Sequence, residues 1–232
     1  MLDANYRNNV IEFRRKAQRV AIKKIVFVDQ TNVNESYRRG YGLAPKGKKA
    51  KVSSRTASRY TPRVDVMGAC VGDRVLDLDV LTPQQRRAAG VKGYTKERVL
   101  SWFRQTLARQ VRALPFKDIV VVVDKALSIR PEDIKQAMAD GQCHNVAQAW
   151  VMETGIAKHC SPLDNAIWRE WKDRIRAAGP VSESALSRII QREWYAMPSD
   201  HVTNYYRKCA LMSLVNCIDH SYSHHTIDSK SM

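Results

Sequence analysis

Residues 119–124 read Ile-Val-Val-Val-Val-Asp, five β-branched apolar residues in a row that end on one acid. A short apolar run of this kind, bounded by polar residues, is typical of a strand buried on both faces at the centre of a helix-covered sheet. Asp124 would then lie at the carboxyl end of the strand, where such sheets bind their ligands. The stretch therefore predicts an α/β fold with a functional edge.

A second run repeats the arrangement, because residues 25–29 read Ile-Val-Phe-Val-Asp. If the two strands are neighbours, Asp29 and Asp124 lie together at one edge of the sheet. A third acid, Asp164, comes near the predicted start of a helix. Carboxylate oxygens are the hard ligands that Mg²⁺ or Mn²⁺ prefers. Without a cation, three gathered carboxylates would repel each other and raise each other's pKa.

Basic residues dominate the composition. The 232 residues carry a formal charge of +16 and give a pI near 9.9, which favours a polyanionic partner such as nucleic acid over an acidic protein. Cations are dense in residues 38–51, where glycines and a proline argue against a helix. A solvated loop is the alternative, but we expect six side chains there to contact a phosphate backbone. They are Arg38, Arg39, Lys46, Lys48, Lys49 and Lys51.

The sequence also bears on the cellular compartment. No apolar stretch approaches the length of a membrane span, and no basic region followed by an apolar core opens the chain as in a secretory signal. Five scattered cysteines indicate reduced thiols. We expect an intracellular, nuclear protein with no membrane partner; an organelle is the alternative, although Asp3 and Glu12 weaken a transit-peptide interpretation.

Periodicity and turn signals divide the rest of the chain. Residues 2–20 predict a helix, and strands at 59–71 and 74–81 form a hairpin that completes a three-strand antiparallel meander with the strand ending at Asp29. A polar link follows residue 82, and residues 155–160 are expected to be a loop. Further elements are predicted as helices at 95–114, from 131, 161–178, 181–197 and 198–220, and a strand at 147–152. The predicted organisation is a core over 1–178, a C-terminal helical extension over 179–220 and a polar tail over 221–232.

Four segments resemble, in the same order, the catalytic domain of mariner- and pogo-like transposases, which belong to the retroviral-integrase, RNase H-like group. They are residues 26–31, 39–47, 121–124 and 161–168, and the resemblance covers about residues 5–215. It implies a mixed sheet with a three-strand antiparallel meander plus parallel strands, flanked by helices. It also implies that Asp29, Asp124 and Asp164 bind Mg²⁺ or Mn²⁺ and catalyse DNA strand cleavage and transfer, in a homodimer or larger nucleoprotein assembly.

The chain departs from that family at three points. Gln30 stands where the family usually has Glu, and Lys125 stands where it usually has Asn. We expect Lys125 either to pair with Asp124 or to contact the scissile phosphate. The residues before the first strand are too few for the usual helix-turn-helix modules. The alternative function is therefore a domesticated, non-catalytic basic component of a DNA- or RNA-protein assembly.

Overall fold

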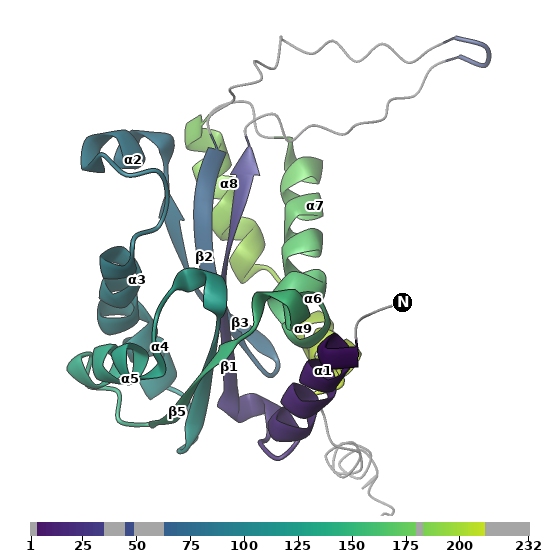
Figure 1. The fold of residues 1–232 in the computed structure, drawn as a ribbon. Helices are drawn as coiled ribbons and strands as arrows, with labels where there is room; N and C mark the ends of the chain where they lie inside the picture. The colour runs from purple at the N-terminus through teal and green to yellow at the C-terminus, as the bar shows by residue number, and fades with distance from the viewer. Residues whose placement is uncertain (1–3, 35–44, 49–62, 180–182, 212–232) are drawn as a thin grey trace, which may run out of the picture.

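A five-stranded mixed sheet forms the centre of the computed structural model, which describes residues 4–34, 45–48, 63–179 and 183–211 (Figure 1). The strands lie in the order β3-β2-β1-β4-β5, with β1–β2 and β2–β3 antiparallel and β1–β4 and β4–β5 parallel. The predicted meander with added parallel strands is confirmed. The bounds are β1 Ile25–Asn34, β2 Arg63–Val71, β3 Arg74–Leu81, β4 Ile119–Asp124 and β5 Val146–Met152.

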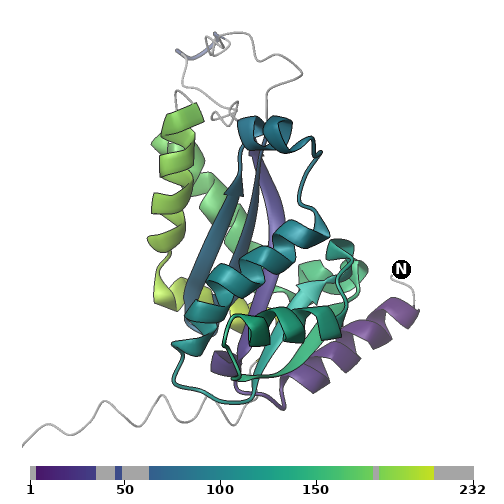
Figure 2. The same cartoon turned by 90° about the vertical axis from the view of Figure 1, so that its left-hand side faces the viewer.

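Helices cover both faces of the sheet (Figures 1 and 2). One face packs against α3, η2, α4 and α5, and the other packs against α1 and the helices from α6 onward. Their bounds are α1 Ala4–Ala17, α2 Pro83–Ala89, α3 Lys96–Trp102, η2 Phe103–Leu107, α4 Ala108–Arg112, α5 Pro131–Asp140, α6 Ala157–Cys160, η5 Leu163–Ile167, α7 Trp168–Ala178, α8 Glu183–Tyr195 and α9 Ser199–Lys208. Three short 3₁₀ turns complete them: η1 Ile22–Lys24, η3 Lys125–Leu127 and η4 Thr154–Ile156.

Alternation along the two central strands decides where the acids point. Side chains of successive strand residues project to opposite faces. Phe27 and Val122 belong to the core that contains α7, whereas Val28 and Val123 belong to the core that contains α3 to α5. Two residues beyond Phe27 and Val122, the Asp29 and Asp124 side chains therefore project toward the α7 side.

Two local expectations are wrong, and a third is refined. The expected polar link after residue 82 is helix α2, which begins with a capping box: Thr82 Oγ1 accepts from the Gln85 N–H, and Gln85 Oε1 accepts from the Thr82 N–H. The expected loop at 155–160 contains η4 and α6. The helix that Thr95 caps runs on as expected, but η2 within it is a π-helical turn.

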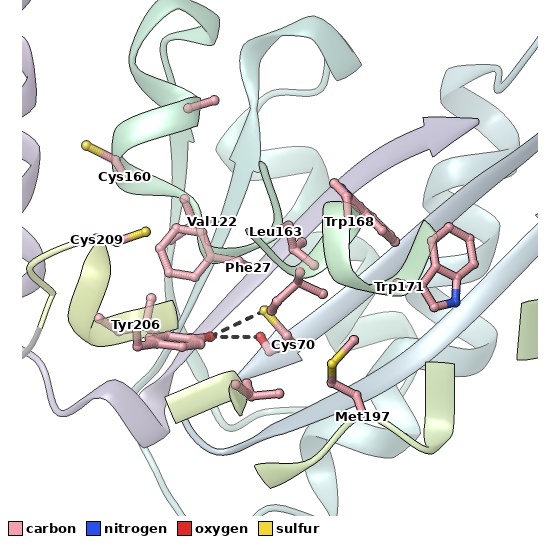
Figure 3. Packing of buried hydrophobic residues seen from close by; sticks show 14 of the residues in the cluster. Phe27, Cys70, Val122, Cys160, Leu163, Trp168, Trp171, Met197, Tyr206 and Cys209 are labelled. Carbon is pink, nitrogen blue, oxygen red and sulfur yellow. Dashed lines mark hydrogen bonds between the residues drawn. The ribbon is translucent and has the colours of Figure 1, made fainter. Parts of the chain in front are cut away.

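The C-terminal helices α8 and α9 join the main core rather than standing apart from it. Trp194 of α8 and Tyr206 of α9 belong to the same buried cluster as the central strands. The Tyr206 hydroxyl lies 3.1 Å from the Cys70 carbonyl oxygen (Figure 3). It also lies 3.0 Å from the Ile25 carbonyl oxygen, so it ties α9 to β1 and β2. The predicted boundary at residue 179 stays a prediction, and the predicted tail lies outside the described residues. Within the described part of the chain, no helix is long and apolar enough to cross a membrane.

We expect Tyr206→Phe to lower the free energy of unfolding by about 1–3 kcal/mol, because it removes a buried donor from two strand carbonyls while it keeps the ring. Urea denaturation would measure this loss. Ile11→Ala, at an exposed position of α1, is the control and should stay within about 0.5 kcal/mol of the parent chain. A Tyr206→Phe variant as stable as the parent would show that this hydroxyl does not anchor α9.

Candidate active site at the carboxyl ends of two strands

The pairing of β1 with β4 places two acids side by side. The register joins Val28 to Val123, so Asp29 and Asp124, the next residue of each strand, lie level with one another. Both are buried, with 7% and 6% of their surface exposed. The sequence predicted this juxtaposition on the condition that the two strands are neighbours, and β1 and β4 do pair.

Asp164 approaches the same place from a helix. It lies in η5, which contacts β1 and continues into α7, and its backbone N–H donates to the Ser161 hydroxyl oxygen at 3.4 Å. Asp164 as a residue is exposed, yet its carboxyl is close enough to Asp29 to form a side-chain hydrogen bond. The structure therefore brings together all three acids that the sequence singled out.

Burial and crowding change the acidity of two of these groups. Burial is the main reason that the pKa of Asp29 is raised to about 8, and the negative charges of Asp164 and Asp124 raise it further. Burial also raises the pKa of Asp164, although the hydrogen bond from Asp29 and the charge of Lys172 act against this rise. In the chain without a cation, Asp29 therefore keeps a proton near neutral pH and shares it with Asp164.

Other contacts hold two of the acids in place. Asp124 Oδ1 accepts from the Ala126 N–H and from the Thr154 hydroxyl, both at 2.6 Å, so this carboxylate caps η3 and is bound to the first residue of η4. Asp29 Oδ2 accepts from the indole Nε1–H of Trp168 at 2.7 Å. Neither the Trp168 donor to Asp29 nor the two donors to Asp124 were predicted from the sequence.

Two lysines near the acids have different roles. The Lys125 ammonium lies 2.9 Å from Glu153 Oε1, so its ion-pair partner is Glu153 and not Asp124. Lys172 donates to the Thr31 hydroxyl oxygen at 2.6 Å. Burial and the nearby Arg176 charge lower the pKa of Lys172, while the charges of Asp29 and Asp164 raise it.

Lys172 was not predicted to lie near the acids, although its spacing from Asp164 and Trp168 along the sequence indicates this. Asp164, Trp168 and Lys172 are separated by four residues each, which places side chains on one face of a helix. That face is directed at β1, since Trp168 reaches Asp29 and Lys172 reaches Thr31. One face of this helix therefore presents to β1 the Asp164 carboxyl, the Trp168 indole N–H and the Lys172 ammonium, in that order.

The predicted phosphate contacts are only partly visible. Lys46 and Lys48 are exposed to solvent, as a role in binding a polyanion requires. Arg38, Arg39, Lys49 and Lys51 lie outside the described residues.

The donor set fits a hard divalent cation in its chemistry. The three carboxylates are close enough to raise the pKa of Asp29, and their mutual repulsion is a cost that a cation would remove. Among the residues that the structure describes, no three His, Cys, Asp or Glu side chains already stand as a preformed metal site. Asp29 and Asp164 would have to give up their shared hydrogen bond before both could act as ligands.

We expect the stability of the cation-free protein to fall as pH rises between about 4 and about 8. Because the pKa of Asp29 is raised on folding, the folded chain holds a proton in this window that the unfolded chain has released. Asp29→Asn should flatten this fall, as urea denaturation in the presence of a chelator at a series of pH values would show. Asp140→Asn, on the surface of α5, should keep the slope; equal slopes in all three chains would contradict the assignment.

Comparisons with known proteins agree with this architecture. No protein-family model matches the chain, and no characterised protein matches it in sequence. Among solved structures, the Mos1 mariner paired-end complex with Mn has a TM-score of 0.67 at 12% identity over 97% of this chain and 65% of that one. The Mos1 paired-end complex with the left transposon end gives 0.65 at 13% identity over 90% of this chain and 60% of that one.

The isolated catalytic domain of Mos1 mariner transposase gives a TM-score of 0.53 at 11% identity, over 90% of this chain and 91% of that domain. The present chain thus spans roughly three-fifths of the longer Mos1 chains but nearly all of their catalytic domain. At sequence identities this low, the similarity shows a shared fold and nothing more. The chain has the RNase H-like fold of the Mos1 mariner transposase catalytic domain.

Proposed function

We propose that this chain is a divalent-metal-dependent enzyme that cleaves and transfers DNA strands, as a transposase catalytic domain does. The observation that carries the proposal is the convergence of Asp29, Asp124 and Asp164, from two parallel strands and one helix, at the carboxyl edge of the sheet. The Mos1 structures with Mn and with transposon-end DNA share this fold and so support the proposal.

Asp29, Asp124 and Asp164 would hold Mg²⁺ or Mn²⁺. A cation bound there supplies Lewis-acid activation of water or of a 3′ hydroxyl and stabilises the leaving oxygen of the phosphodiester. Thr154 and the Ala126 N–H fix the Asp124 carboxylate through Oδ1. Asp29 must lose the proton that it shares with Asp164, so binding of the cation should be favoured as pH rises.

The basic side chains would bind the DNA backbone. Lys172 borders the acids, and its ammonium is suited to a phosphate oxygen beside the reacting bond. Lys46 and Lys48, together with the other cations of residues 38–51, would neutralise phosphates farther away. We propose that the protein acts in the nucleus, in a homodimer or a larger nucleoprotein assembly.

We expect Asp124→Asn to abolish Mn²⁺-dependent nicking of plasmid DNA and to leave DNA binding intact. The amide keeps the size of the side chain but removes the charge that a cation needs. Nicking on agarose gels and fluorescence anisotropy with a labelled duplex would measure the two properties, with Asp140→Asn as the control. Equal nicking by Asp124→Asn would reject the catalytic assignment.

The same experiment separates the proposal from the alternative. A parent chain that binds DNA tightly but shows neither nicking nor calorimetric binding of millimolar Mn²⁺ would be a basic nucleic-acid-binding component without catalytic activity. RNA in place of the duplex would then identify the preferred polymer.

We expect the double variant Lys46→Ala, Lys48→Ala to weaken DNA binding equally for unrelated sequences. Each lost phosphate contact should reduce the slope of log K against log salt by about 1, so the slope should fall by about 2. Anisotropy titrations at several salt concentrations would measure it. Lys135→Ala, on α5, is the matched control, and an unchanged slope in the double variant would remove these two lysines from the interface.

A further inference from the structure

We infer that Trp168 is a positioning residue, which orients the Asp29 carboxylate for cation binding, and that Gly68 and Trp194 hold its indole in place. This inference deepens the proposed function and rests on it. It assigns a role in the site to β2 and α8, neither of which supplies one of the three acids.

The contact between Trp168 and Asp29 is short and shielded from water. Indole Nε1 lies 2.7 Å from Asp29 Oδ2, and both residues are buried. An indole N–H only donates, so this bond fixes which carboxylate oxygen faces the tryptophan.

Gly68 makes space for the indole. It lies opposite Asp29 in the β1–β2 register, so a side chain at this position would stand next to the Asp29 carboxylate. A Cβ at Gly68 would come within 2.8 Å of the Trp168 ring and 2.9 Å of the Trp194 ring. The two indoles therefore occupy the place of a side chain on β2.

Trp194 supports the indole from α8. Its ring stacks on the Trp168 ring with centroids 5.1 Å apart and planes inclined by 28°. Its own Nε1 is buried and has no hydrogen-bond partner among the described residues. Trp194 thus acts on Trp168 through ring packing alone.

A neighbouring tryptophan shows what an ordinary core role looks like. Trp171, on the same helix and in the same aromatic cluster, donates its N–H to the backbone carbonyl of Ile190. Trp168 instead donates to a candidate metal ligand. Partners that orient metal ligands typically change metal affinity or activity by about 10–100-fold when they are lost.

The first test compares Trp168→Phe with Trp171→Phe. Both variants keep an aromatic ring and lose one buried N–H donor, but only the first loses a donor to Asp29. Calorimetric titration with Mn²⁺ should show about 10-fold weaker binding in Trp168→Phe and parent-like binding in Trp171→Phe. Thermal midpoints of the two variants should be similar, and parent-like Mn²⁺ binding by Trp168→Phe would overturn the inference.

The second test needs no cation and no activity. In a ¹H–¹⁵N correlation spectrum, the indole signal that disappears in Trp168→Phe belongs to Trp168. That signal should shift in Asp29→Asn, and in Gly68→Ala because a new Cβ would displace the ring, while the Trp102 indole signal stays in place. A Trp168 indole signal that keeps its position in both variants would overturn the inference.

The two tests separate this inference from the proposed function. A parent chain that binds no Mn²⁺ would end the proposed function, whereas the indole shift would still show whether Trp168 holds Asp29. If the parent chain binds Mn²⁺ and nicks DNA, and Trp168→Phe behaves like the parent, the proposed function is supported. The positioning role of Trp168 is then contradicted.

Discussion

Burial and mutual repulsion of carboxylates form the constraint on which the candidate site of this molecule depends. The parallel register of β1 and β4 forces Asp29 and Asp124 to the same level, and η5 brings Asp164 against them. Burial makes the repulsion stronger, because little water is present to screen it. The cation-free chain relieves the strain by keeping a proton on Asp29, and a divalent ion would relieve it more completely.

The three acids are held by different kinds of element. Asp29 and Asp124 are fixed to two central strands, and each accepts a hydrogen bond from a side chain outside its own strand. Asp164 belongs to a helix whose first turns form η5, so its position depends on how that helix packs against β1. The site therefore combines two acids on neighbouring strands with one on a helix.

Much of this arrangement follows from local sequence patterns. The runs at 25–29 and 119–124 specify buried strands, and their matching ends place two acids on one edge. The Trp168–Asp29 bond was not predictable in this way, because it joins residues 139 positions apart and depends on how α7 docks. The helix after Thr82 was missed for the opposite reason: its capping box was present in the sequence, but the segment was interpreted as a polar link.

The aromatic packing over β2 has a consequence for divergence among related chains. Position 68 can accept a side chain only if the rings from positions 168 and 194 retreat, since they fill that space. A substitution at any one of these positions thus creates selection for compensating changes at the other two. Sequences that share this architecture should show the three sites evolving in concert, although β2 is far from α7 and α8 along the chain.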